Sequence, residues 1–274
     1  MTHRSPWKNF LATLAGLIAM AVTTTAALAN NYQDLWWNPA ESGWGINISQ
    51  QGDVMFATWF IYGANNQPTW IFLSHANRSG ALGNTFSDRI YQATTGSPFA
   101  AVPFMPSLPA NFREVGSATL VFADARSATL TYNVDGVTVV KQITRQTIGV
   151  FNLTGSYFGG LKREGSGCVN AAFNGSALTQ ATYSINHTPA TGALSIVDVG
   201  GSSCNFSGTT QVFGSIMEGS GNYTCFGEAF AANPTGSWTM REGRPSANAF
   251  SAMLALRPSG DACTLNATIG GLRP

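Results

Sequence analysis

In the first third of the chain, apolar and polar side chains alternate with the period of a half-buried β-strand. The first alternating run, residues 44–49, is followed by Gly52-Asp53, a pair that suits a tight hairpin turn. The second run, 54–62, is apolar on both sides, and a third run begins after the turn-forming residues 63–68. The pattern predicts a three-stranded antiparallel meander in which strand 54–62, apolar on both faces, is central and not an edge strand.

Alternation returns further along the chain, at 117–122, 128–133 and 137–147. Asp135-Gly136 is a strong signal for a type I′ hairpin turn between the last two of these runs. Residues 94–110, which contain Pro98, Pro103, Pro106 and Pro109, predict an irregular loop laid over the surface. Because closure removes exposed strand edges, we expect an antiparallel sheet or barrel of roughly seven or eight strands from Trp36 to about Ile148.

The second half contains glycine-aromatic units near Gly155, Gly221 and Gly236, where glycine relieves close approach and the aromatic ring fills a core. Such units are typical of strand starts in a small meander. The sequence therefore predicts an all-β fold of two antiparallel meander or barrel-like modules, 30–150 and 151–274. Six further short runs in this half are expected to be strands: 181–186, 192–197, 205–210, 214–217, 219–226 and 251–257.

Residues 1–29 have the three parts of a secretory signal peptide: a basic start, an apolar run over 10–22, and Ala27-Leu28-Ala29 as a cleavage site. A membrane anchor is the less favoured reading, because the strictly apolar run is short for a span. No cysteine follows the cleavage site closely, which disfavours a lipid anchor. We expect export to the periplasm or beyond, with no stable membrane span after signal cleavage.

All four cysteines, Cys168, Cys204, Cys225 and Cys263, lie in the second half. An even number of cysteines in an exported chain predicts two disulfides, for which three connectivities are possible. We favour Cys204 with Cys225, which leaves Cys168 with Cys263. A zinc site is the alternative, but the spacing contains no Cys-x-x-Cys pair and His187 is the one histidine of this half. We therefore expect no metal and no other cofactor.

The charge balance limits the classes of binding partner that are expected. The formal net charge is +1, and the chain after residue 29 has two lysines, Lys141 and Lys162. Binding to nucleic acid requires clustered Lys and Arg to neutralise phosphates, so no nucleic-acid partner is expected. Few charged residues and many glycines fit an exported all-β protein.

The segment Trp-Trp-Asn-Pro-Ala-Glu-Ser-Gly-Trp-Gly at 36–45 is followed by Phe-Ala-Thr-Trp-Phe at 56–60 and Pro-Thr-Trp at 68–70. These motifs resemble a group of uncharacterised exported bacterial proteins, of proteobacterial type, that share a WWNPxESGWG signature. The resemblance covers most of the chain after residue 29 and implies bacterial export. It carries over no catalytic residue.

Aromatic side chains around this segment suggest a binding module. A platform could be formed by Trp36, Trp37, Trp44, Trp59 and Trp70, with Asn38 and Glu41 orienting a ligand by hydrogen bonds. Trp36, Trp37 and Trp44 lie beside a turn and are the better candidates for exposure. The ligand classes considered are carbohydrate, peptide or another envelope component. The competing interpretation is that these five tryptophans simply fill the core.

A hydrolase acting on an envelope or extracellular polymer is the alternative function. Glu41, flanked by tryptophans, is the best candidate acid, with Asp34 or Asp53 as its only guessed partners. A carboxylate that accepts backbone N–H groups in the turn is the more ordinary role for Glu41. A serine hydrolase is disfavoured by the absence of a Gly-x-Ser-x-Gly elbow, and an outer-membrane barrel by the cysteines and the proline-rich loop.

The sequence thus favours an exported, non-enzymatic all-β protein with an aromatic binding surface. It leaves the ligand and the oligomeric state open.

Overall fold

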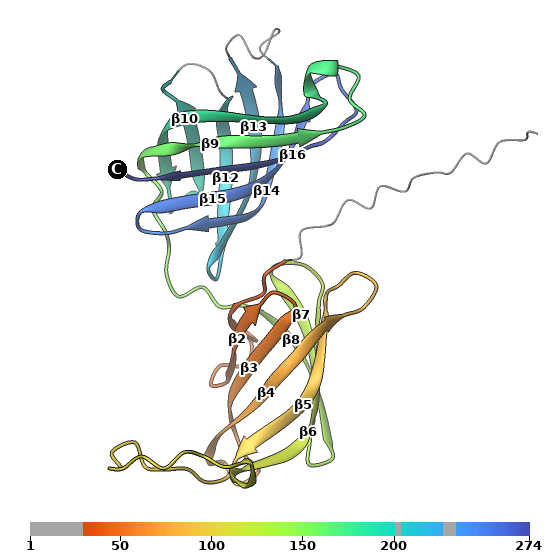
Figure 1. Cartoon of the computed structure of the whole chain (residues 1–274), viewed down its shortest axis with the longest axis vertical. Coiled ribbons are helices and arrows are strands. Elements are labelled where there is room, and N and C mark those ends of the chain that lie inside the picture. The colour runs from red at the N-terminus through yellow and green to blue at the C-terminus, as the bar shows by residue number, and fades with distance from the viewer. Residues whose placement is uncertain (1–29, 201–203, 227–233) are drawn as a thin grey trace, which may run out of the picture.

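The computed structural model describes residues 30–200, 204–226 and 234–274. The predicted signal peptide, residues 1–29, lies outside the described residues. The strands form two closed antiparallel barrels of eight strands each, and Figure 1 shows them arranged end to end. In the part of the chain that is described, no helix is long and apolar enough to cross a membrane.

Consecutive strands are neighbours throughout each barrel, so each barrel is an up-and-down meander closed between its first and last strands. The first barrel contains β1 (Asp34–Trp37), β2 (Gly45–Gln51), β3 (Val54–Tyr62), β4 (Pro68–Ser79), β5 (Thr85–Ala93), β6 (Phe112–Phe122), β7 (Ser127–Val134) and β8 (Val137–Arg145), with the 3-10 helix η1 (Pro109–Asn111) before β6. The second contains β9 (Gly155–Gly165), the 3-10 helix η2 (Ala171–Phe173), β10 (Gly175–Thr188), β11 (Ala193–Asp198), β12 (Cys204–Phe213), β13 (Ile216–Cys225), β14 (Thr235–Pro245), β15 (Ala249–Pro258) and β16 (Leu265–Leu272).

The interior of the first barrel is filled by large apolar side chains. Trp36 and Trp59 are fully buried, and Tyr32 stacks on Phe122 with ring centroids 3.6 Å apart. The predicted meander and the predicted barrel are confirmed. Strand 54–62 is central as predicted, because β3 pairs with β2 and β4, but its outer apolar face is not covered: alternate side chains of β3 point away from the core, and Phe60 is 58% exposed. A single-layer barrel covers only the inner face of each strand.

The second barrel differs in detail from the sequence prediction. β13 is one continuous strand with an irregular register between Met217 and Gly219, where the sequence predicted two short strands. β16 was not predicted, because its two glycines and alternating small residues give a weak strand pattern.

The glycine-aromatic units have a packing explanation. Gly208 on β12 pairs with Gly221 on β13, and Trp238 on β14 lies against both strands. A Cβ atom on Gly208 would lie 2.8 Å from the Trp238 ring. The Trp238 indole donates hydrogen bonds to the carbonyl oxygens of Ser207 and Asn222, at 3.1 Å each. Glycine therefore makes room for a ring that crosses the strands closely.

Both predicted disulfides are present. Cys204 and Cys225 are directly opposite each other on β12 and β13, whereas Cys168 and Cys263 join the segment after β9 to the segment before β16. Asp261 lies beside this second disulfide and accepts hydrogen bonds from the backbone N–H groups of Val169 and Asn170. The two sulfur atoms are bonded to each other, so this Cys-Asp-Cys group offers no thiolate ligands to a metal.

The two disulfides are expected to differ in their contribution to stability. They close loops of 95 and 21 residues, which in the chain-entropy model corresponds to about 4.7 and about 3 kcal/mol. We therefore predict that the Cys168→Ser/Cys263→Ser variant unfolds at lower urea concentration than the Cys204→Ser/Cys225→Ser variant. Equal midpoints, or the reverse order, would contradict this prediction.

The two barrels meet where the β12–β13 hairpin of the second reaches the end of the first (Figure 1). Asp34 at the start of β1 accepts hydrogen bonds from the Ser215 backbone N–H and hydroxyl, at 2.8 and 2.9 Å. The Gly214 N–H donates to the Thr147 hydroxyl at 2.9 Å. Nearby, Arg126 stacks on Phe213 with its guanidinium carbon 4.9 Å from the ring centroid.

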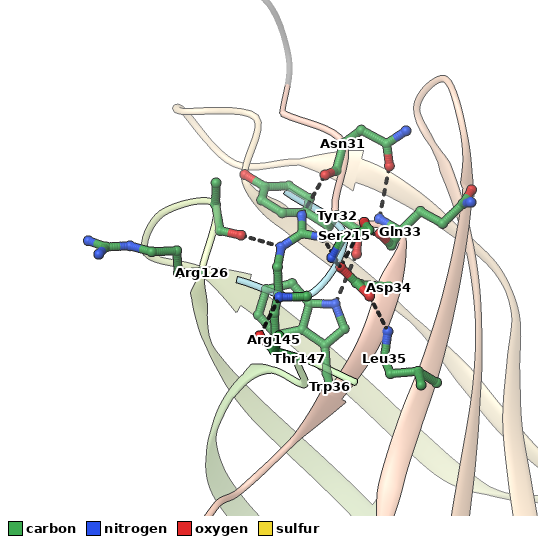
Figure 2. Close-up of polar contacts among 12 residues, drawn as sticks. Asn31, Tyr32, Gln33, Asp34, Leu35, Trp36, Arg126, Arg145, Thr147 and Ser215 are labelled. Atoms are coloured by element: carbon green, nitrogen blue, oxygen red, sulfur yellow. Dashed lines mark hydrogen bonds and ion pairs between the residues drawn. The ribbon is translucent and has the colours of Figure 1, made fainter. Parts of the chain in front are cut away.

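Arg145 at the end of β8 connects several segments of the first barrel at this joint, as Figure 2 shows. Its guanidinium pairs with Asp34 at 2.7 Å and donates to the carbonyl oxygens of Asn31 and Ala125. It also lies 5.0 Å from the centroid of the Trp36 ring. The side chain is only 1% exposed, so its charge is almost entirely removed from water and depends on these partners.

We predict that Asp34→Ala destabilises the first barrel by about 3–5 kcal/mol, because it leaves a buried guanidinium without its counter-ion. Ser215→Ala removes one hydroxyl that donates to the same carboxylate and should cost only about 0.5–1.5 kcal/mol. Urea unfolding followed by tryptophan fluorescence measures both. Similar losses for the two variants would show that the ion pair is not the main support of this end.

Candidate functional site

A shallow groove lies on the outside of the first barrel, across β1, β2 and β3. Its volume is about 390 Å³. The lining comes mainly from outward-facing positions of these strands, from the turn between β1 and β2, and from the residue after β8. The residues that line it are Leu35, Trp36, Trp37, Ser42, Gly43, Trp44, Gly45, Ile46, Asn47, Phe60 and Gln146.

Gly45 forms the floor of the groove. It pairs with Phe60 on β3, and Trp37 on β1 lies on its other side, because Trp36 pairs with the next residue, Ile46. Outward side chains on two strands separated by a third stand about 10 Å apart at the backbone. Since Gly45 has no side chain, the space between the Trp37 and Phe60 rings stays open. This gap could admit a flat ring with an aromatic wall on each side.

Polar groups accompany the two aromatic walls. Asn47 faces outward on β2, Ser42 lies in the β1–β2 turn, and Gln146 follows β8. Amide and hydroxyl groups can both donate and accept hydrogen bonds, which suits a ligand rich in hydroxyl groups. The groove therefore combines apolar stacking surfaces with polar groups that can donate or accept hydrogen bonds.

Glu41 and Trp44 form a fixed unit beside the groove. The Glu41 carboxylate accepts a hydrogen bond from Lys141 at 2.6 Å and from the Trp44 indole at 3.1 Å. The Lys141 ammonium also lies 5.7 Å from the centroid of the Trp44 ring. The bond from Lys141, with a smaller contribution from Trp44, lowers the pKa of Glu41 below its ordinary value of 4.5. Glu41 is thus ionised at neutral pH, and its role in the structure is to hold the Trp44 ring.

The five residues that the sequence suggested as a binding site have different roles in the structure. Trp37 and Trp44 line the groove and are partly exposed. The expected exposure of Trp36 is wrong: it is completely buried, because it alternates inward on β1, and its indole donates to the Tyr32 carbonyl at 2.9 Å. The Asn38 side chain accepts the Ala40 N–H at 3.0 Å and so closes the turn.

Asp34 and Asp53, the guessed acid partners of Glu41, do not lie beside it. Asp34 belongs to the joint with the second barrel, and Asp53 pairs with Arg78 at 2.7 Å in the turn after β2. Glu41 precedes β2 and therefore lies at the opposite end of the barrel. The carboxylate pair that a glycosidase needs is not formed by these residues.

The sequence did not suggest Phe60 or Gly45 as site residues, nor a neighbouring group of outward aromatic side chains, of which only Trp70 was a candidate. Phe72 on β4 is the centre of this group, which we call the outer aromatic cluster. Its ring centroid is 6.1 Å from that of Phe56, 5.5 Å from Trp70, 5.8 Å from Tyr91 and 5.7 Å from Phe112. The two-sided apolar pattern of strand 54–62 could have indicated this surface, because a strand of a single-layer barrel that is apolar on both faces must expose its outer face.

No family model matches the chain, and no curated protein matches it. Among solved structures, it is similar to a candidate outer membrane protein from Bacteroides fragilis, with 12% identity, 88% of this chain and 96% of the other covered, and a TM-score of 0.28. It is also similar to transferrin binding protein B from serogroup B Neisseria meningitidis, with 7% identity, 88% and 69% coverage, and a TM-score of 0.33. These values are too low to transfer a function.

The Glu41–Lys141 pair gives a pH prediction. A carboxyl group whose pKa is lowered by folding stabilises the fold above its unfolded pKa, and this contribution is lost as pH falls through the folded pKa. We therefore expect the Trp44 indole N–H signal to shift when pH falls below 4.5, as Glu41 becomes protonated. In Lys141→Met the transition should move to higher pH.

Lys162→Met is the matched control, because Lys162 pairs with Glu164 in the second barrel. NMR titration of the Glu41 carboxyl and the Trp44 indole measures both variants. An unchanged Glu41 titration in Lys141→Met would contradict the assigned cause of the shift.

Proposed function

We propose that this protein is an exported, envelope-associated binding protein that holds a carbohydrate chain in the groove between Trp37 and Phe60. The observation that carries the proposal is the open space above Gly45 with an aromatic side chain on each side. Sugar rings present apolar C–H faces to aromatic rings and hydroxyl groups to amides. The groove offers both kinds of contact in a space of about 390 Å³, enough for one or two sugar units.

Closure of the barrels favours a sugar over an extended peptide. A peptide usually gains affinity by adding a strand to an exposed sheet edge. Both barrels are closed, with β1 paired to β8 and β16 paired to β9, so the described strands offer no such edge. Recognition on this surface must come from side chains, which suits stacked sugar rings.

Binding is better supported than hydrolysis. A glycosidase acid must keep its proton near neutral pH, which requires a raised pKa. Hydrogen bonds from Lys141 and Trp44 lower the pKa of Glu41 instead.

The envelope assignment rests on three features of the chain. The two disulfides fit an oxidising compartment. The predicted signal peptide and the resemblance of residues 36–45 to exported bacterial proteins point to the same location.

Gly45→Leu tests the groove without removing an aromatic residue. A Cβ at this position would lie 3.4 Å from the Trp36 carbonyl oxygen, an ordinary contact, so the barrel should remain folded while the side chain fills the groove. We expect Gly45→Leu and Trp37→Ala each to weaken binding to soluble cello- or chito-oligosaccharides or peptidoglycan fragments by at least about tenfold. Isothermal titration and pull-down on the insoluble polymers measure the effect.

Gly149→Leu is the matched control, because a Cβ at Gly149 meets no atom within 4 Å and the residue lies outside the groove. It should bind as the unmodified protein does. Absence of binding to every glycan tested, or equal weakening by Gly149→Leu, would refute the proposal.

A further inference from the structure

The segment between β5 and β6, residues 94–111, projects from the end of the first barrel that faces away from the second barrel (Figure 1). We call it the β5–β6 arm. Its apolar side chains point into solvent, where folded proteins rarely place so many together. The exposed fractions are 101% for Phe99, 95% for Val102, 60% for Phe104, 64% for Met105 and 65% for Leu108.

The polar groups of the arm are directed inward, toward the arm itself. The Ser97 hydroxyl donates to the Met105 carbonyl at 2.9 Å and accepts the Met105 N–H at 3.0 Å. At its base, the Thr94 N–H donates to the Asn111 carbonyl at 2.8 Å. These bonds connect the two sides of the arm and satisfy the backbone groups of Met105, Thr94 and Asn111 locally.

The arm and its surroundings carry almost no net charge. No charged residue lies between Arg89 and Arg113 in the sequence. Arg113 pairs with Asp135 at 2.5 Å, and Arg89 pairs with Glu114 at 2.9 Å. The arm also continues into the outer aromatic cluster through Phe112, which is 37% exposed.

We propose that the β5–β6 arm inserts into the interfacial region of a lipid bilayer and so docks the first barrel on a membrane surface. A segment that enters lipid must satisfy its own backbone hydrogen bonds, because hydrocarbon offers no partners. The bonds of Met105 and Thr94 and the four prolines, which have no N–H group, remove part of this demand, and at the depth of the headgroups the remaining N–H groups can bond water. The arm presents aromatic and aliphatic side chains of the kind that partition at the interface.

The shape of the arm selects lipid over other occupants. Phe99 and Val102 are almost completely exposed and project outward, so a rigid protein partner would need deep complementary pockets for them. A fluid bilayer adapts to a projecting arm without such pockets. Four prolines within the arm restrict its backbone before binding, which lowers the entropy lost on insertion. The lack of charge predicts binding that does not depend on anionic lipid.

The test is sedimentation of the signal-cleaved chain with vesicles of phosphatidylcholine alone and with added phosphatidylglycerol. We expect comparable binding to both and little change between about 50 and 500 mM salt, because no charge pairing is involved. Brominated phosphatidylcholine should quench Trp70 fluorescence, since Trp70 belongs to the adjoining outer aromatic cluster. The Phe99→Ser/Phe104→Ser variant should bind at least about tenfold more weakly.

Leu82→Ser is the matched control, because Leu82 is 85% exposed in the β4–β5 hairpin at the opposite end of the barrel. It should bind vesicles normally, and thermal unfolding should show that both variants remain folded. Failure of the unmodified chain to bind vesicles, or equal loss in Leu82→Ser, would overturn the proposal. The unmodified chain could instead self-associate without binding vesicles. If the Phe99→Ser/Phe104→Ser variant abolished that self-association, the arm would be a contact surface for a second copy of the chain.

This inference is independent of the carbohydrate groove. Gly45→Leu should bind vesicles like the unmodified chain, and Phe99→Ser/Phe104→Ser should bind sugars normally. Loss of one activity without the other therefore identifies which of the two proposals has failed.

Discussion

The buried ion pair between Arg145 and Asp34 is the constraint on which the arrangement of the molecule depends. Arg145 ends the last strand of the first barrel and Asp34 begins the first strand, so the pair lies where the barrel closes. The same carboxylate accepts two hydrogen bonds from Ser215, which belongs to the second barrel. One buried charge pair thus supports both the closure of the first barrel and the joint between the barrels. Burial makes the pair costly to break, because either charge left alone would be desolvated without compensation.

Closure also explains where the candidate sites lie. Each strand of a single-layer barrel has one inner face, and in the first barrel large side chains such as Trp36 and Trp59 fill the space inside. Binding surfaces must then lie on the outer face or at the free end. The groove at Gly45 and the β5–β6 arm occupy these two places. The groove combines aromatic walls with polar groups, whereas the arm presents exposed apolar side chains and no charge. The two differ in the chemistry of the ligand that each can hold.

Much of the fold could be predicted because its signals are local. Alternation marked β2, β3, β4, β6, β7 and β8, and Asp135-Gly136 marked a hairpin turn. The even cysteine count predicted two disulfides, and the favoured pairing among the three possible ones is the observed one. The site was predicted less well. Trp36 and Trp37 are adjacent and chemically identical, yet one is buried and the other lines the groove. Their difference is set by which residue faces inward on β1, and a strand of four residues shows too little alternation to reveal it.

By itself, the sequence determined an all-β chain with a turn-rich first meander, two disulfides in the second half and a proline-rich segment free of charge, because strand period, turn chemistry and composition act over a few residues. Only the tertiary structure decided which partners meet across the barrels. Glu41 and Lys141 are 100 residues apart in the chain, and Asp34 and Ser215 are 181 apart, yet each pair forms a hydrogen bond. Such contacts follow from strand register and barrel closure, which bring distant segments together and which no local pattern encodes.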